Sequence, residues 1–521
     1  MNALITKNSE HVTGELSGWD RIVFRGNLRM IAYVEGMLAY LWRTKTLLME
    51  FKAHAQAMTK QLIEASRQRA IMEKRPVKYI ESSSERKDEI AREIARKDGI
   101  TEGLICVLEC VEPCQTFDIF KNRKTKRLEL VARKRKCKFI YHYWIDPQFG
   151  FMSARVQTWF PFPIQVCMNG REWLARRLDE HGLAYKRYDN SFTWIEDFPK
   201  AQKIFNKMLD INWPKVLQAV ARRVHPAHAS MFRGLGFNYY WSAFQTEWAT
   251  DIAFDSRQAL AAIYPQLTRG AIATFDSQSV MRFLGHQLRT NHKGEVISDY
   301  RERPEGVRVK HYANGNSIKV YDKGGLVLRI ETTINNPSVY RSYRPSETDP
   351  KGKKGKKKWR VMRRGVADMY RRSEVSQDAN DRYAEALAAL DTTTPVEQLA
   401  APVCRRVSKD GKRYRAIQPF AAEDRTLLEA ISDGQYALSG FSNGDLAARL
   451  YPASAKSTDK AERGRIASKI SYRLRILRAH GLIRKLPRQR RYHITTRGRE
   501  IVTALLQVQH ATLQQLNALA A

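Results

Sequence analysis

Several features that would reveal a protein's class are missing from this 521-residue chain. It has no apolar run long enough to span a bilayer, and its first residues do not follow the basic-then-apolar pattern of a secretion signal. It contains no Walker loop, G-x-G-x-x-G or H-E-x-x-H sequence, so ATP hydrolysis, dinucleotide redox chemistry and zinc proteolysis have no support. Three of its six cysteines, Cys106, Cys110 and Cys114, are spaced four apart within an apolar stretch, unlike zinc-ribbon ligands. We therefore expect a soluble, cytoplasmic protein with no membrane partner.

Acidic residues are also scarce. The 54 Asp and Glu residues face 90 Lys and Arg residues, which gives a net charge of +36 and a pI near 10.0. A field of this sign attracts polyanions, and the resulting association depends on salt. Because 43% of the residues are hydrophobic, the chain can form a buried core and is not a disordered basic tail. We expect a nucleic-acid partner, with DNA favoured and RNA open, and the sequence does not indicate an oligomeric state.

The length predicts two or three domains, and the hydrophobic pattern predicts an α+β fold whose strands are antiparallel because short turns join them. Residues 1–100 are expected to be mainly helical, and 101–344 to form an α+β body that binds nucleic acid. Residues 345–414 are expected to be a basic linker and a helix, and 415–521 a winged helix. No internal repeat is visible in the sequence.

The clearest pattern in the body is a three-stranded meander over 306–336. Asn314-Gly315 predicts a two-residue hairpin turn, which places Arg308 opposite Tyr321 and Lys310 opposite Lys319. A three-residue loop from Gly324 to Leu326 keeps each face consistent, with Lys319 opposite Glu331 and Tyr321 opposite Arg329. One face is then apolar, and the other alternates cationic and aromatic side chains. That face is either an ordinary solvent-facing surface or a nucleic-acid platform.

Glu331 and Tyr321 are the candidate catalytic residues on this face. The string YDK…LRIE within 318–333 resembles strands of rolling-circle replication initiators, although the paired-histidine metal motif of that family is absent. The resemblance implies that Glu331 holds a divalent metal beside a nucleophilic Tyr321. Alternatively, Glu331 simply pairs with Lys319 or Arg329. The metal ligands are not otherwise identified, and no cofactor is assigned except Mg²⁺ or Mn²⁺ if the protein is a nuclease.

Other carboxylates could build a two-metal nuclease from distant strands. The candidates are Asp20, Asp251, Asp255 and Asp276, each within or near an expected strand. Isolated aspartates near strand ends more often cap helices or stabilise turns, and this is the interpretation we favour for them.

The C-terminal segment is predicted to form two helices, a long basic helix, a basic hairpin and a final helix. Residues 461–499 hold 13 Lys and Arg residues and one acidic residue, Glu462. The order of elements and the segment LRAHGLIRKLPRQRRYHITTRGRE resemble the winged-helix domains of MarR-like transcription regulators. An apolar stripe at Ile466, Ile470, Leu474 and Leu477 would face the core. The predicted DNA-binding residues are Arg465, Ser468, Lys469, Tyr472 and Arg475 on the helix, and Arg488, Arg490 and Arg491 in the wing.

Two further tracts are strongly basic: 121–138, with ten Lys and Arg residues, and 351–372, with eleven. The residues predicted to contact the nucleic-acid backbone are Arg308, Lys310, Lys319, Arg329, Lys353, Lys354, Lys356 and Lys357. This layout suggests a mobile-element DNA-processing factor, a replication initiator or transposase-like protein. Its enzymatic activity would be that of a metal-dependent nuclease, nickase or transposase. The alternative is a non-enzymatic DNA-binding regulator or a protein partner of a structured RNA.

Overall fold

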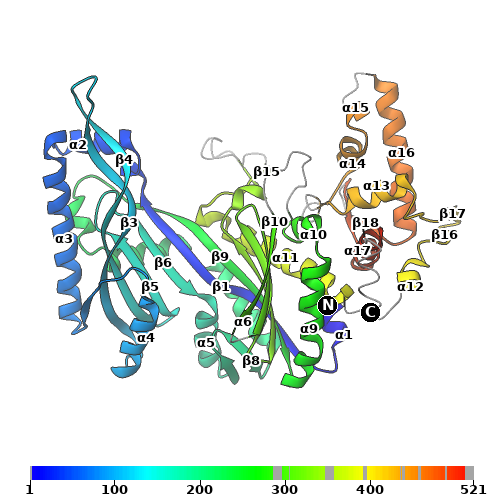
Figure 1. Cartoon of the computed structure of the whole chain (residues 1–521), viewed down its shortest axis with the longest axis horizontal. Helices are drawn as coiled ribbons and strands as arrows, with labels where there is room; N and C mark the ends of the chain where they lie inside the picture. The colour runs from blue at the N-terminus through cyan, green and yellow to red at the C-terminus, as the bar shows by residue number, and fades with distance from the viewer. Residues whose placement is uncertain are drawn as a thin grey trace.

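The computed structural model describes residues 3–285, 296–303, 306–345, 357–390, 396–433, 436, 440–455, 459–486 and 490–510. Its centre is an eleven-stranded sheet in the order β10-β11-β12-β13-β9-β1-β6-β5-β4-β3-β2, antiparallel except for the β2–β3 pair (Figure 1). The strands are β1 (Val12–Leu28), β2 (Val77–Ile80), β3 (Gly103–Lys121), β4 (Leu128–Asp146), β5 (Gly150–Gln157), β6 (Ile164–Asn169), β9 (Tyr239–Phe254), β10 (Val296–Arg303), β11 (Gly306–Ala313), β12 (Asn316–Lys323) and β13 (Val327–Ile334). The expected α+β fold with an antiparallel sheet is thus confirmed.

The sheet consists of two groups of strands with similar connectivity, except that the first group has an additional edge strand, β2, parallel to β3. In the first group, β1 is followed by helices and by the meander β3–β6, whose last strand returns to pair with β1. In the second group, β9 is followed by helices and by the meander β10–β13, whose last strand returns to pair with β9. β1 and β9 pair with each other at the centre, where Trp19 is the register partner of Trp248. The repeat is therefore one of topology and leaves no visible trace in the sequence.

Helices cover most of one face of the sheet. α11 packs on β9 and β13, α7 on β5, β6 and β9, and α3 on β3. α5, α6 and the β7–β8 hairpin lie against part of the other face, at β1, β9 and β13. The helices before the C-terminal region are α1 (Ala3–Lys7), α2 (Val34–Arg43), α3 (Phe51–Met72), α4 (Lys87–Lys97), α5 (Gly170–Glu180), α6 (Phe198–Asn206), α7 (Trp213–Val224), α8 (His228–Met231), α9 (Arg257–Thr274), α10 (Ser277–Phe283) and α11 (Met369–Leu390). No helix in the described ranges is long and apolar enough to cross a membrane.

The meander predicted for 306–336 has the predicted register. Arg308 pairs with Tyr321 and Lys310 with Lys319 across β11 and β12. Lys319 pairs with Glu331, and Lys323 with Val327, which leaves a three-residue loop between β12 and β13. Asn314 and Gly315 both have positive φ, 52° and 81°, as a two-residue turn of this kind requires. The apolar side chains of β12 and β13 join the core beneath α9, α10 and α11.

Two of the expected segment boundaries differ in the structure. Residues 1–100 contain α2, α3 and α4, but they also contribute β1 to the centre of the sheet, so they belong to the body. α11, expected within the 345–414 linker and helix, packs on β9 and β13, and Asn380 bonds to Thr332 of the sheet. On either side of 346–356, β14 (Arg341–Arg344) pairs with β15 (Lys358–Val361). The many charged residues of α11 concealed its attachment to the sheet, and β1 pairs with β9, which lies more than 200 residues further along the chain.

The C-terminal residues form a separate cluster of helices at one end of the molecule (Figure 1). α13, α14, α16 and α17 share a core with the strand β18 and, at its margin, β19. α17 packs against α11, and Arg499 forms a 2.6 Å ion pair with Glu385 of that helix. The remaining elements are β7 (Tyr185–Tyr188), β8 (Ser191–Ile195), α12 (Val396–Ala400), β16 (Val407–Lys409), β17 (Lys412–Tyr414), α13 (Ala422–Ile431), α14 (Asn443–Leu450), α15 (Pro452–Ala455), α16 (Lys460–Ala479), β18 (Ile483–Lys485), β19 (Tyr492–Ile494) and α17 (Thr496–His510).

Candidate functional site

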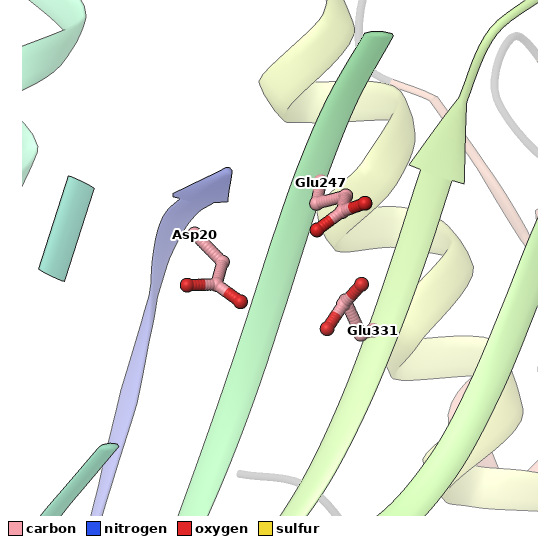
Figure 2. A group of neighbouring side chains, drawn as sticks. All are labelled: Asp20, Glu247 and Glu331. Carbon is pink, nitrogen blue, oxygen red and sulfur yellow. The ribbon is translucent and has the colours of Figure 1, made fainter. Parts of the chain in front are cut away.

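Three carboxylates from adjacent strands converge on one face of the central sheet. Asp20 comes from β1, Glu247 from β9 and Glu331 from β13, and one ligand atom of each lies within 4.8 Å of the others. Figure 2 shows the three side chains pointing toward one another. The opposite face of the same strands carries Thr332, which bonds to Asn380 of α11, so the carboxylates lie on the face away from that helix. Carboxylate oxygens so arranged are suitable ligands for a hard divalent cation.

A bulge in β1 and a neighbouring hairpin position Asp20. The pairing of β1 with β9 shifts register between Trp19 and Ile22, and Asp20 lies within this irregular stretch. Asn190, in the turn between β7 and β8, donates to both oxygens of Asp20 at 2.8 and 2.9 Å. Asn169, which also caps α5, donates to one of them at 3.1 Å. These amides hold the Asp20 carboxylate in place at the centre of the sheet.

Glu331 is bound by two neighbours from β12. The Tyr321 hydroxyl donates to Glu331 Oε2 at 2.7 Å, and Lys319 Nζ lies 2.8 Å from Glu331 Oε1. The Lys319 ammonium also lies 4.9 Å from the centroid of the Tyr321 ring. The two candidate catalytic residues are thus in contact, and of the two pairings left open for Glu331 the structure shows the one with Lys319.

Arg329 is fully buried and pairs with two aspartates. It contacts Asp251 at 2.5 and 2.8 Å and Asp20 at 3.1 Å. Arg171, also fully buried, lies 3.2 Å from Asp251. Arg329 was expected to contact a nucleic-acid backbone, but a guanidinium enclosed in this way cannot reach one. Its role is to balance the buried acids beneath the site.

Burial disfavours the charged forms of Asp20 and Glu247, whereas Glu331 is held in its charged form. Burial, followed by the charge of Glu331, raises the pKa of Glu247 to about 7. Burial also raises the pKa of Asp20, and the charge of Arg329 offsets this only in part. Burial alone would raise the pKa of Glu331, but Lys319, Arg329 and the hydrogen bond from Tyr321 together outweigh it and lower the pKa. Among the ion pairs of the described residues, none involves Glu247, whose Oε1 accepts a hydrogen bond from Gln245.

The structure separates the four aspartates considered for a nuclease. Asp20 and Asp251 come together through Arg329. Asp255 is exposed and pairs with His11, while Asp276 caps α10, as expected for isolated aspartates. Glu247 was missed, although it stands four residues before Asp251 and so faces the same side of a regular strand. That alternation was the one signal available in the sequence.

Cationic residues extend from the cluster across the outer strands. Lys319, Lys310 and Arg308 lie on the same face, on β12 and β11. Burial and then the charges of Lys319 and Arg308 lower the pKa of Lys310. Lys357 is exposed beside β15. Lys353, Lys354 and Lys356 lie outside the described residues.

The predicted residues of the long C-terminal helix share an exposed surface. Ile470, Leu474 and Leu477 are buried and Ile466 is partly buried, as the apolar stripe predicted. In the hairpin that follows, Arg490 is exposed, whereas Arg491 turns inward to bond with Gly440 and with Asp445 at 3.0 Å. Arg488 lies outside the described residues. On the helix, Lys469 forms a 3.4 Å ion pair with Glu423 of α13. All five predicted helix residues are exposed: Arg465, Ser468, Lys469, Tyr472 and Arg475.

Comparison with protein-family models, with curated proteins and with solved structures found no match.

Proposed function

We propose that this chain is a DNA-processing protein of the mobile-element type. In this proposal the sheet of the body cleaves a phosphodiester bond with a divalent metal, and the C-terminal unit binds duplex DNA. The observation that carries it is the convergence of Asp20, Glu247 and Glu331 beside the Tyr321 hydroxyl, in a chain of net charge +36. Several acids held close together destabilise one another unless a bound cation neutralises them, and such clusters are therefore common at functional sites.

Mg²⁺ or Mn²⁺ fits this group of ligands. Both ions prefer oxygen ligands, and all three side chains offer carboxylate oxygens. Glu247, without a cationic partner among the described ion pairs, would gain one from the metal. The buried Ser317 hydroxyl has no hydrogen-bond partner among the described residues and lies diagonally across from Glu331 on the same face. A bound ion would polarise the phosphate and neutralise charge that develops there.

Tyr321 is the nucleophile in this proposal. Its oxygen forms a bond to phosphorus, the bond from phosphorus to the leaving nucleoside oxygen breaks, and the phenolic proton passes to Glu331 along the existing hydrogen bond. The leaving oxygen is protonated from solvent. Burial and the charge of Glu331 raise the pKa of Tyr321 well above its usual value, so the hydroxyl stays protonated and needs the charge of a bound metal ion, in addition to that of Lys319, to become a nucleophile. Cleavage is therefore expected to depend strictly on metal.

The C-terminal unit is proposed to be a winged helix. α13, α14 and α16 would form its helical core, α16 its recognition helix, and β18 with β19 the base of its wing. The exposed side of α16 carries Arg465, Lys469 and Arg475, side chains suited to phosphate and base contacts in a major groove. Contact between α17 and α11 would hold this unit beside the body.

A gel assay tests the proposal. Labelled single-stranded DNA, duplex DNA and RNA are incubated with the full chain, with and without Mg²⁺ or Mn²⁺. We expect cleavage of DNA only with metal, loss of cleavage in Glu331→Ala, and loss of a covalent protein–DNA adduct in Tyr321→Phe. Asp255→Asn, at an exposed site outside the cluster, is the control and should retain activity.

A second candidate function has one observation in its favour. Lys319 already neutralises Glu331, and Arg329 neutralises Asp20, as in a purely structural ion network. The chain would then be a non-enzymatic DNA-binding regulator or a protein partner of a structured RNA. Binding without cleavage under every metal condition would favour this function over the first.

A further inference from the structure

A cavity of about 650 Å³ opens on the first group of strands, away from the carboxylate cluster. Its floor includes a row of register partners across three strands: Arg25 of β1, Gln165 of β6 and Arg155 of β5. Phe139 of β4 and Tyr33, just before α2, also line it. Its volume lies within the range of sites that hold small organic ligands.

Arg25 is the cation of the cavity that has no carboxylate partner among the described ion pairs. Burial and then the charges of Arg155 and Arg364 lower the pKa of Arg25, and Glu35, the acid that lines the cavity, forms no ion pair with it in the described part of the chain. None of the ion pairs formed by the described residues involves Arg25. Arg155, by contrast, is balanced by Glu112 at 2.8 Å and donates to Gln165 at 3.2 Å. A half-buried guanidinium without a carboxylate is suited to an anionic group, above all a phosphate.

Aromatic rings stand beside this charge. Phe139 is nearly buried, and the Arg155 guanidinium lies 5.1 Å from the centroid of its ring. Tyr33 is 51% exposed and therefore free to receive a planar group at the mouth of the cavity. A phosphate-binding cation next to aromatic faces is the combination that holds a nucleotide in single-stranded nucleic acid, since bases stack on such rings.

The cavity and the carboxylate cluster face the same side of the sheet. Val23 is the register partner of Gln245, and residues two apart on a strand share a face, so Arg25 lies on the face of Glu247. Arg25 is five positions after Asp20 on β1, a span of about 17 Å. A strand of nucleic acid lying across the sheet therefore reaches both places.

We propose that this cavity binds one nucleotide of a single-stranded DNA, with its phosphate on Arg25 and its base on the exposed ring of Tyr33. The proposal deepens the function proposed above, on which it rests for the identity of the polymer. A free nucleotide and a nucleotide within a strand present the same phosphate and base to this cavity.

Fluorescence anisotropy with a labelled single-stranded oligonucleotide and the full-length chain, in EDTA, tests the proposal. We expect Arg25→Ala to weaken binding about ten-fold and to reduce the salt slope by about 0.7, the value for one lost phosphate contact. Tyr33→Ala, at an exposed position where folding is not at risk, should weaken binding several-fold without altering the salt slope. Arg222→Ala, on the exposed side of α7 across the sheet, is the matched control and should leave binding unchanged.

The outcomes separate this proposal from the proposed function. Loss of affinity in Arg25→Ala and Tyr33→Ala without any metal-dependent cleavage would support the cavity and contradict the catalytic function. Cleavage with unchanged affinity in both variants would overturn the cavity alone. A deoxynucleoside monophosphate could also bind the cavity to saturation and yet fail to compete with the oligonucleotide. This result would show that the ligand is a free nucleotide and would overturn the proposal that the cavity binds single-stranded DNA.

Discussion

Arg329 and Asp251 form an ion pair with two contacts, 2.5 and 2.8 Å, and neither side chain is exposed by more than 2%. They lie directly opposite each other on β13 and β9. Glu331 and its partner Ala249 are two residues further along these strands, on the same face. Burial alone would raise the pKa of Asp251, but the charges of Arg171 and Arg329 outweigh it and lower the pKa. The pair therefore supports the floor of the candidate site.

Removal of Asp251 is expected to destabilise the body. Asp251→Ala leaves the Arg329 guanidinium buried beside fewer acids, which costs about 3–5 kcal/mol of unfolding free energy. Urea unfolding followed by tryptophan fluorescence measures this, since Trp19 and Trp248 pack edge to face 4.8 Å apart in the same strands. Asp255→Ala, at the exposed end of β9, should change stability little. Equal midpoints for the two variants would contradict this account of the pair.

Stability should depend on pH through Glu15. Burial and then the charge of Asp381 raise its pKa to about 7, so the folded protein holds this proton more tightly than the unfolded chain does. The associated stability is present below the unfolded pKa, near 4.5, and is lost as the pH rises through 7. Glu15→Gln should therefore be more stable than the parent at pH 8, by about 1–3 kcal/mol, and nearly equal to it at pH 4.5.

Thermal unfolding at the two pH values checks this sign. Glu10→Gln, at an exposed position nearby, is the control and should follow the parent at both. A Glu15→Gln variant less stable than the parent at pH 8 would show that Glu15 is charged and favourably bound in the folded protein.

Duplex DNA binding should depend on the exposed side of α16. Arg465→Ala and Arg475→Ala are each expected to weaken duplex binding and to reduce the salt slope by about 0.9, because each would remove one phosphate contact. Anisotropy titrations at several salt concentrations measure both quantities. Arg413→Ala, exposed on the separate hairpin of β16 and β17, should have no such effect. An unchanged slope in both α16 variants would place the duplex elsewhere on the chain.

Metal binding should be visible without any nucleic acid. Mn²⁺ is expected to raise the melting temperature of the parent protein, because a ligand that binds only the folded state stabilises it. Glu247→Gln should remove most of this increase, whereas Glu15→Gln, an equally conservative change outside the cluster, should keep it. The same Mn²⁺-induced shift in both variants would exclude the three carboxylates as the site.

Local patterns predicted local structure well. The Asn314-Gly315 turn and the alternation on either side of it gave the full register of β11, β12 and β13, because a one-residue slip would exchange the two faces. The apolar stripe of α16 likewise predicted which side is buried. Both depend on residues close together in the chain.

Long-range relationships were not predictable in this way. Glu331 and Tyr321 were found because ten residues separate them, but Asp20 and Glu247 join them only through pairing of β1, β9 and β13. Arg329 shares a face of the sheet with Tyr321 and Glu331, and the sequence predicted that this face is exposed. Arg329 is buried because the β7–β8 hairpin covers it. The pairing of β1 with β9, which are far apart in the sequence, decided the first outcome, and the position of the β7–β8 hairpin decided the second.

The rate of Mn²⁺-dependent cleavage of single-stranded DNA by the full chain tests the central claim most directly. Each of the three carboxylates is replaced in turn by its amide, and Glu15→Gln serves as the matched control. The account predicts cleavage by the parent and by Glu15→Gln, with a loss of about 100-fold or more in Asp20→Asn, Glu247→Gln and Glu331→Gln, since each removes a charge that positions the metal. Cleavage that is absent from the parent, or that persists in all three amide variants, would contradict it.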